Sequence, residues 1–217
     1  MTSDLSIIIP TLNAAAFLHS TLARISGAAE VIVVDGGSSD GTPERAAALG
    51  ARVIVAPRGR GGQIAAGIAV ASHAWLLLLH ADTRLAPGWQ SAVHDDPGCA
   101  GYFRLALDSG DKRARRLERL VAWRCRVLGL PYGDQGLLIH RELLHAVGGM
   151  RGLPLMEDVD LVRRLGRYRL IALAADAVTS AEKWERQGYL LRSTRNLLCL
   201  ALWFAWVPPR LIVRIYG

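Results

Sequence analysis

The 217 residues are enough for one sizeable domain, and 51% of them are hydrophobic. The three cysteines lie far apart and form no Cys-x-x-Cys pair, which argues against a zinc site or a disulfide framework and suits a reducing compartment. The net charge of +7 comes from residues 111–217, which carry a net +9, whereas residues 1–110 carry −2. This basic half would attract nucleic acid, anionic lipid or phosphorylated substrates, and a plain solvated surface explains it equally well.

The first 85 residues alternate between short apolar runs and helical patterns. The apolar runs predict strands at residues 5–10, 31–34, 52–55 and 75–79, with helices between them. The last run, Trp75 to Leu79, has no polar alternation, which is typical of a strand buried on both faces. This order predicts a doubly wound parallel sheet with right-handed crossovers.

Beyond Pro87 the alternation is less regular. Further strands are predicted at residues 102–107, 136–140 and 170–173, and helices at residues 112–128 and 157–165. Another helix should end at Gly148-Gly149. The N-terminus has no basic region followed by an apolar core, so no signal peptide is evident and a cytoplasmic location is the default expectation.

Polar residues follow the predicted strands at the sheet edge where ligands of such sheets bind. Asp35 ends the second strand before two glycines and two serines, and it could accept hydrogen bonds from a base or a ribose. An ordinary Asp-Gly turn is the alternative. The loop matches neither the dinucleotide pattern nor the P-loop pattern, which disfavours a nicotinamide enzyme and an ATPase. The glycine-rich segment from Arg58 to Gln63 precedes a helix, whose N-terminus would attract phosphate.

Two further segments carry carboxylates. Asp82 follows the fourth strand, where it could ligate Mg²⁺ or Mn²⁺, since such ions take one or two protein carboxylates alongside substrate phosphates. His80 is either a second ligand or a satisfied strand-end histidine, because neutral imidazole suits Mg²⁺ poorly. Glu157, Asp158 and Asp160 begin a helix, where they either complement its dipole or supply a general base.

These segments together resemble a known family. The residues from Ser6 to Asn13, Val33 to Thr42, His80 to Thr83 and Glu157-Asp158 are similar to a family 2 glycosyltransferase of the GT-A type. A finer resemblance is to the bacterial radical-SAM/selenodomain-associated, or arsenosugar-biosynthesis, glycosyltransferases. It is carried by Tyr132 to Gly136, Gly148-Gly149, Pro154 to Asp158, Thr179-Ser180, Trp184 and Gly188.

The resemblance implies a Rossmann-like α/β fold of the GT-A type, a mostly parallel sheet flanked by helices, with a C-terminal amphipathic helical tail. It implies one domain over residues 1–217, with a nucleotide-binding half at 1–85, an acceptor and catalytic half at 86–188 and the tail at 189–217. The implied reaction is a metal-dependent, inverting transfer of a sugar from a nucleotide-sugar, with UDP-sugars favoured, to the hydroxyl of an acceptor whose identity stays open.

The resemblance also implies roles for residues of this chain. The nucleotide would be held by Pro10, Thr11, Asp35, Arg58, Gln63 and Asp82, and the metal by Asp82 with or without His80. Asp158 would be the catalytic base, supported by Glu157. Asp134, Gln135 and Trp184 would form the acceptor side.

Three positions depart from the family pattern. Gly36 stands where many family 2 enzymes have a second aspartate, and His80 replaces the first carboxylate of the usual Asp-x-Asp. Near Trp184 the usual arginine pair is Glu182-Lys183, and lysine does not form the same fork as arginine.

The tail contains eleven consecutive apolar residues, 197–207, which are too few to span a bilayer, since a span needs about 20. Flanking arginines and internal tryptophans suit a peripheral membrane segment, and a helix packed on the domain or a dimer contact is the alternative.

No nucleic acid partner is expected. A GT-A-like nucleotidyltransferase is a second hypothesis, although Pro10 to Asn13 is not the glycine-rich loop that it would need. A third hypothesis is a non-catalytic, membrane-associated binding protein. The presence of the candidate site residues argues against it: Asp35, Asp82, Glu157 and Asp158.

Overall fold

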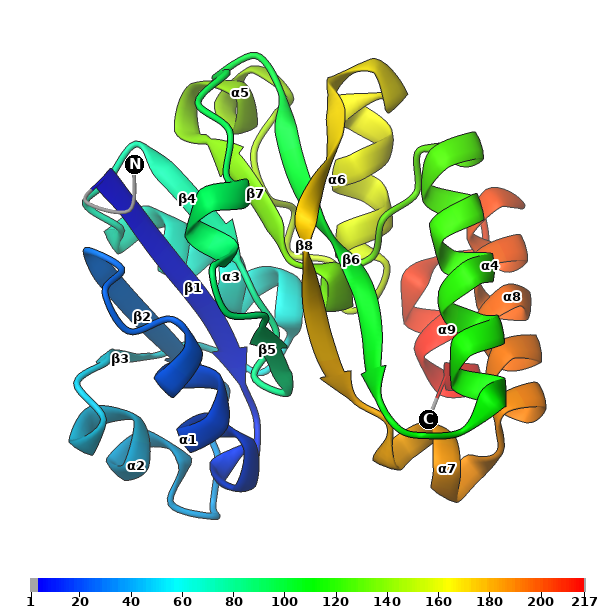
Figure 1. The fold of residues 1–217 in the computed structure, drawn as a ribbon, viewed down its shortest axis with the longest axis horizontal. Coiled ribbons are helices and arrows are strands. Elements are labelled where there is room, and N and C mark those ends of the chain that lie inside the picture. The colour runs from blue at the N-terminus through cyan, green and yellow to red at the C-terminus, as the bar shows by residue number, and fades with distance from the viewer. Residues whose placement is uncertain (1–3, 217) are drawn as a thin grey trace.

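Our computed structural model describes residues 4–216 of the protein. The fold is an eight-stranded mixed sheet with helices on both faces (Figure 1). The strand order is β3-β2-β1-β4-β7-β6-β8-β5. The strands are β1 Leu5–Thr11, β2 Glu30–Asp35, β3 Arg52–Val55, β4 Trp75–Leu78, β5 Thr83–Leu85, β6 Ala100–Asp108, β7 Leu137–His140 and β8 Leu170–Ser180. The helices are α1 Ala15–Arg24, α2 Thr42–Ala48, α3 Arg60–Val70, α4 Lys112–Leu128, α5 Arg141–Ala146, α6 Glu157–Leu165, α7 Glu182–Gln187, α8 Tyr189–Phe204 and α9 Pro209–Tyr216, with short 3₁₀ turns η2 Trp89–Ala92, η3 Gly133–Gln135 and η4 Arg167–Arg169.

The first half of the sheet confirms the predicted parallel arrangement. Strands β3, β2, β1 and β4 are neighbours and pair in parallel. The apolar run of β4 is buried on both faces, as predicted, because its residues alternate between two cores. Leu76 and Leu78 pack with residues of α3 and α6, whereas Leu77 and Leu79 pack with residues of α1. The register places Thr11 beside Asp35, so the loops after β1 and β2 meet at one edge.

The second half is mixed, and here the strand predictions were incomplete. Strand β7 runs antiparallel to β4 and β6, while β6 and β8 are parallel. Strand β8 extends to Ser180 instead of ending at Leu173, and β5 was not predicted. The missed stretch, Ala174 to Ser180, contains three alanines and an aspartate, which have low strand propensity, so its pairing with β5 and β6 decides its conformation.

The tail is helical and packs on the domain. Cys199 of α8 and Ile212 of α9 are fully buried in the same core as α3 and α6. The apolar run does not form one continuous helix, since α8 ends at Phe204. Among residues 4–216, no helix has both the length and the apolar character that a membrane span requires.

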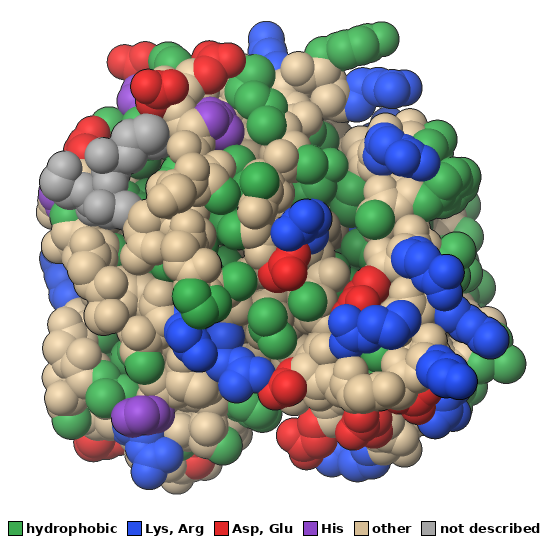
Figure 2. Space-filling view, in the orientation of Figure 1, with side chains coloured by type: hydrophobic (Ala, Val, Ile, Leu, Met, Phe, Trp, Pro, Cys, Tyr) green, Lys and Arg blue, Asp and Glu red, His purple; other side chains and the backbone are tan. Residues whose placement is uncertain are grey.

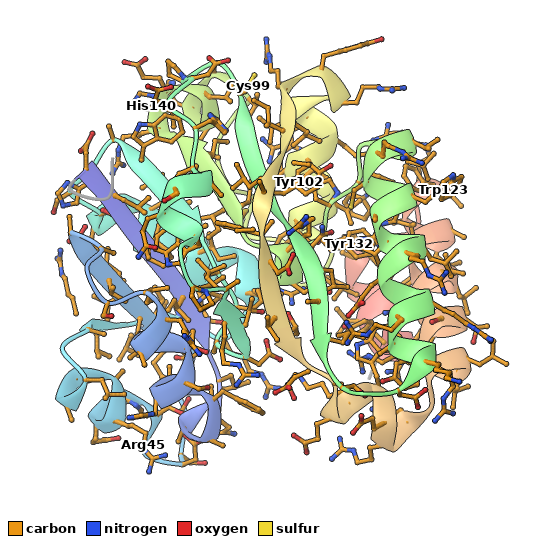
Figure 3. All side chains as sticks on the ribbon, in the orientation of Figure 1. Arg45, Cys99, Tyr102, Trp123, Tyr132 and His140 are labelled. Atoms are coloured by element: carbon orange, nitrogen blue, oxygen red, sulfur yellow. The ribbon has the colours of Figure 1, made fainter. Side chains whose placement is uncertain are left out.

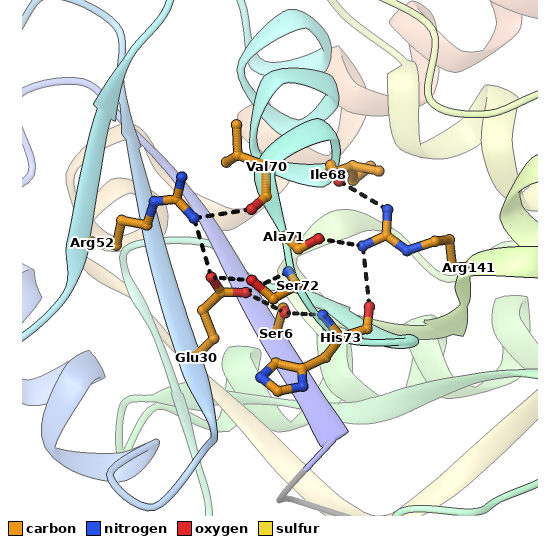
Figure 4. A network of polar contacts seen from close by, with 9 residues as sticks. All are labelled: Ser6, Glu30, Arg52, Ile68, Val70, Ala71, Ser72, His73 and Arg141. Carbon is orange, nitrogen blue, oxygen red and sulfur yellow. Dashed lines mark hydrogen bonds and ion pairs between the residues drawn. The ribbon is translucent and has the colours of Figure 1, made fainter.

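A polar network at the opposite edge of the sheet anchors the far end of α3 (Figure 4). The Glu30 carboxylate accepts hydrogen bonds from Ser6 Oγ at 2.6 Å and Ser72 N at 2.8 Å. The Arg141 guanidinium donates to three carbonyl oxygens at the end of α3 and the following turn, those of Ile68, Ala71 and His73. With its C-terminal end held in this way, α3 presents its N-terminal end to the opposite edge.

Gly67 allows α3 to approach the sheet closely, and this gives a stability prediction. A Cβ at position 67 would lie 2.5 Å from Ile8 Cγ2 and 2.9 Å from Val34 Cγ2. We expect Gly67→Ala to lower the free energy of unfolding by about 1–3 kcal/mol through overpacking, measured by urea denaturation. Gly62→Ala is the matched control in the same helix, because nothing lies within 4 Å of its Cβ, and it should raise that free energy by about 0.5–1 kcal/mol. The same sign for both variants would contradict this account.

Candidate active site

The carboxyl end of β1 and the segments that follow β3 and β4 line a cleft of about 710 Å³. Its wall includes Pro10, Thr11, Asn13, Phe17, Arg58, Arg60, Gln63, His80, Asp82, Lys183, Val213 and Tyr216. Of the six predicted nucleotide contacts, only Asp35 is not on this wall. The cleft therefore brings together segments that are far apart in the sequence, although the role of each residue stays a prediction.

The Asp35 carboxylate is used inside its own loop. It accepts hydrogen bonds from Thr11 Oγ1 at 3.1 Å, from the backbone of Gly37 at 2.9 Å and of Ser38 at 2.8 Å, and from the Ser38 hydroxyl. Burial opposes its ionisation, but these hydrogen bonds together hold the pKa of Asp35 below its ordinary value. Asp35 is only 2% exposed and is not on the cleft wall; its carboxylate holds the loop after β2, and its contact with a nucleotide stays a prediction.

Gln63 occupies the space that a side chain at position 36 would take. Its Nε2 donates to the carbonyl oxygens of Thr11 and Val34, both at 2.8 Å. A Cβ at Gly36 would lie 3.0 Å from this nitrogen. The departure from the family pattern at Gly36 therefore accompanies a buried amide that ties α3 to the ends of β1 and β2.

The His80 imidazole lies between the two halves of the site. Loss of solvent and, next, the positive charge of Arg60 lower the pKa of His80 to about 4, against the opposing effect of the carboxylates of Asp82 and Asp158. The imidazole is therefore neutral near pH 7. Its Nε2 would be 2.5 Å from a Cβ at position 133, so Gly133 leaves the room that His80 needs.

Asp82 faces the cleft beside a lysine. Its Oδ2 lies 3.8 Å from Lys183 Nζ, and both side chains are partly exposed. Lys183 comes from α7, directly after the long strand β8, so this cation reaches Asp82 through the tertiary fold. The segment that departs from the family's arginine pair thus still supplies a positive charge to the cleft.

The start of α6 places the proposed base. Asp158 Oδ2 accepts a hydrogen bond from Gly133 N at 2.8 Å, which fixes the orientation of this carboxylate. Glu157 is 1% exposed and forms an ion pair with Arg60. Burial and the neighbouring Asp158 raise the pKa of Glu157, against the opposing effect of Arg60.

Asp134 is a second buried carboxyl group close to Asp158. Its Oδ1 is buried and has no hydrogen-bond partner among the described residues. Burial raises the pKa of Asp134 to about 6, and the charges of Asp158 and Asp82 add to this rise, while Arg124 opposes it. The 3₁₀ turn η3 therefore presents a polar group without a partner close to Asp158, and its acceptor role stays a prediction.

The other two residues predicted for the acceptor side do not line the cleft. Gln135 is 1% exposed, donates to Phe103 O at 3.0 Å and accepts from Cys125 Sγ at 3.2 Å, so it holds η3 in place from the interior. Trp184 stacks on Tyr189 with their ring centroids 6.0 Å apart. Neither residue is on the wall of this cleft, and their acceptor roles stay predictions.

Four polar residues of the cleft wall were not among the predicted site residues: Asn13, Arg60, Lys183 and Tyr216. Arg60 lay inside the glycine-rich loop, where its spacing could have indicated phosphate contact as readily as that of Arg58. Tyr216 carries no local signal, because only the packing of α9 against the core brings it to the cleft.

The donor set of the cleft suits a metal that is shared with a substrate. Within residues 4–216, no group of three His, Cys, Asp or Glu side chains could hold a metal by itself. Asp82 is the only carboxylate among the described residues of the cleft wall, and His80 is the only imidazole. One carboxylate fits an ion such as Mg²⁺ or Mn²⁺ that takes its remaining ligands from phosphates and water.

Comparison with known sequences defines the family. The model of "Glycosyl transferase family 2" matches residues 6–152. An uncharacterized glycosyltransferase of Mycobacterium tuberculosis is 34% identical over 180 residues, which cover 79% of this chain and 78% of the relative. The chain therefore belongs to glycosyltransferase family 2.

Solved structures share the fold. A mannosyltransferase from Pyrobaculum calidifontis in complex with GDP-Man and Mn²⁺ aligns with a TM-score of 0.65 at 20% identity, covering 88% of this chain and 59% of that one. Glucosyl-3-phosphoglycerate synthase from Mycobacterium tuberculosis in complex with Mn²⁺ and UDP-glucose aligns with a TM-score of 0.57 at 23% identity, covering 81% and 69%. The fold is thus that of the GT-A glycosyltransferases, as predicted.

The raised pKa of Asp134 predicts how stability depends on pH. Because the folded protein binds this proton more tightly than the unfolded chain, Asp134 costs stability as the pH rises from about 4 through about 6. Relative to the wild type, the free energy of unfolding of Asp134→Asn should therefore increase by up to about 3 kcal/mol between pH 4 and pH 8. Urea denaturation at both pH values measures this, with the exposed Asp95→Asn as the charge-matched control. A difference from the wild type that is the same at both pH values would contradict the burial of the charged form.

Proposed function

We propose that this glycosyltransferase is a metal-dependent, inverting enzyme that transfers a sugar from a nucleotide-sugar to an acceptor hydroxyl. The observation that carries the proposal is the position of Asp158. Its carboxylate is oriented by Gly133 N, next to a cleft that holds Asp82 and several cations. UDP-sugars are the favoured donors, since one structural neighbour binds UDP-glucose. The resemblance to the radical-SAM-associated, arsenosugar-biosynthesis subfamily belongs to the same proposal.

The donor would lie along the cleft with its diphosphate near the start of α3. Arg58 and Arg60 flank Gly59 there, and Lys183 approaches from α7. Helix N-termini and arginine side chains both favour phosphate. Pro10 and Thr11, on the wall formed by the end of β1, would contact the nucleoside.

Asp82 would hold the divalent ion together with the diphosphate, and His80 is placed to be a second ligand. The bound ion would neutralise charge on the leaving diphosphate. The neighbouring residues would keep these two side chains in position, since Lys183 lies beside Asp82 and Gly133 leaves space for the His80 ring.

Asp158 would act as general base on the acceptor. It takes the hydroxyl proton while the acceptor oxygen attacks the anomeric carbon from the side opposite the diphosphate. The bond from that carbon to the diphosphate oxygen breaks as the glycosidic bond forms, so the configuration inverts. Glu157, which directly precedes Asp158 and is paired with Arg60, would hold the start of α6 and so the base in position.

Nucleotide binding in the presence of Mn²⁺ tests the donor and metal assignments together. We expect UDP-glucose to raise the melting temperature of the wild type, and Mn²⁺ to increase this shift. In Asp82→Ala the increase due to Mn²⁺ should disappear, because the ion loses its protein carboxylate. Asp158→Asn is the matched control: it should keep the Mn²⁺-dependent shift but lose transfer by about 10²–10⁴-fold, since a base acts in the transition state. No nucleotide-sugar binding at all, or donor affinity lost in Asp158→Asn, would contradict the proposal.

The outer face of the helical layer suits peripheral contact with an anionic membrane. Large apolar side chains are exposed on α4 and α8 and after α8, with Trp123 51%, Leu190 79% and Trp206 93% exposed. Figure 2 shows hydrophobic and basic side chains interleaved along the edge formed by α4 and α8, and Figure 3 shows Trp123 on the outer side of α4. Apolar groups interleaved with arginines match the boundary between lipid headgroups and acyl chains.

Vesicle binding tests this surface. The wild type should co-sediment with vesicles of phosphatidylglycerol and phosphatidylcholine more than with phosphatidylcholine alone. Trp206→Ser should weaken this binding about ten-fold, the value of one buried large side chain. Val55→Ser, which changes an exposed residue of the distant edge strand β3, is the control and should bind like the wild type. Equal binding to both vesicle types would contradict membrane contact.

A further inference from the structure

The C-terminal helices form part of the active-site wall. Val213 and Tyr216 of α9 line the same cleft as Asp82. The helix is held there by Ile212, which is fully buried in the core shared with α3 and α6. The guanidinium of Arg195, on α8, lies 5.6 Å from the centre of the Tyr216 ring. The end of the chain is therefore anchored at the site by both apolar and cation–π contacts.

A smaller cavity of about 60 Å³ lies between α6 and these helices. Its polar lining comes from Arg60, Tyr132, Asp158, Asn196 and Tyr216. Arg60 and Tyr216 also line the donor cleft, so the two spaces adjoin each other. Figure 3 shows Tyr132 in the region between β6 and α4, where Arg124 lies 3.5 Å above its ring. The proposed base lines the smaller space, which adjoins the donor cleft at Arg60 and Tyr216.

Asn196 supplies an independent sign of a ligand in the smaller cavity. Its Oδ1 is buried and has no hydrogen-bond partner among the described residues. A buried carbonyl oxygen without a donor is unfavourable, and native proteins pair almost all such atoms. Asn196 Oδ1 and the Asp158 carboxylate are both hydrogen-bond acceptors on one cavity wall, so they match a ligand with two donors, such as a diol.

The charge of the cavity argues for a neutral ligand. Arg60 is the only cation among the described residues that line it, and Arg60 is already paired with Glu157. The remaining lining is apolar, from Leu155, Met156 and Val159, and suits the C–H face of a polyol or sugar. A phosphate-bearing acceptor would find no free cation among these residues.

We infer that this cavity is the acceptor subsite and that it takes a small, neutral polyhydroxylated molecule. One hydroxyl lies at Asp158 and gives up its proton there, and a second hydroxyl donates to Asn196 Oδ1. Tyr216 lines both the subsite and the donor cleft. This inference rests on the proposed function, because it assumes that Asp158 is the base of a sugar transfer.

The test uses glycerol and glycerol 3-phosphate as acceptors, with UDP-glucose and Mn²⁺. The wild type should transfer glucose to glycerol with saturation and should prefer it to glycerol 3-phosphate. In Asn196→Ala the KM for glycerol should rise about ten-fold, while kcat at saturating glycerol and the Kd of UDP with Mn²⁺ stay within about two-fold. Asn196→Asp, which keeps an oxygen acceptor, should restore most of the affinity for glycerol.

Neighbouring exposed residues provide the controls. Leu197→Ala on α8 and Ile215→Ala on α9 change side chains that are 63% and 43% exposed, and neither should alter the KM for glycerol. An unchanged KM in Asn196→Ala, a preference for glycerol 3-phosphate, or hydrolysis of UDP-glucose without transfer to glycerol would overturn the inference and leave the proposed enzyme class standing. Failure of the wild type to bind UDP-glucose would instead count against the proposed function.

Discussion

The ion pair between Arg60 and Glu157 is the contact on which the active site depends. It joins the first residue of α3 to the first residue of α6, two helices that are 97 residues apart in the sequence at this contact. Glu157 is 1% exposed, and removing one partner of such a pair costs about 3–5 kcal/mol because an uncompensated charge stays buried. Gly61 makes the approach possible, since a Cβ there would lie 2.5 Å from Arg151 O. Asp158 follows Glu157 directly, so the same contact positions the base.

Each of two departures from the family pattern is matched by a second residue that fits it in space. Gly36 accompanies Gln63, whose amide fills the space above the ends of β1 and β2. His80 accompanies Gly133, and its neutral imidazole stands where a further carboxylate would add to the charges of Asp82 and Asp158. Nearby negative charges raise one another's pKa, and the charges of Asp158 and Asp82 add to the rise that burial causes in the pKa of Asp134. A neutral group at position 80 therefore limits this repulsion.

Sequence patterns predicted the elements that depend on local burial but not those that depend on assembly. The apolar run of β4 indicated a strand buried on both faces, and the two cores around it confirm this. Strand β8 was predicted too short, because pairing with β5 and β6 overrides the weak propensity of its alanines. Trp184 and Gln135 were assigned to the acceptor side from motifs; Trp184 stacks on Tyr189 and Gln135 bonds to Phe103 O, contacts that the motifs did not reveal. Tyr216 reaches the cleft only through the placement of α9, which no local pattern indicates.

The residues that hold the site together and the residues of the α8–α9 wall lie in different parts of the fold. The parallel strands, the Asp35 loop and the start of α6 are tied together by buried hydrogen bonds and an ion pair, so a substitution there disturbs donor and base together. The wall formed by α8 and α9 is fastened through Cys199 and Ile212, while Asn196 and Tyr216 face the cavity. Side chains on that wall can change without altering the sheet, because no strand depends on them. A fold by itself does not determine a substrate, so under our proposal residues of α8 and α9 set the acceptor preference.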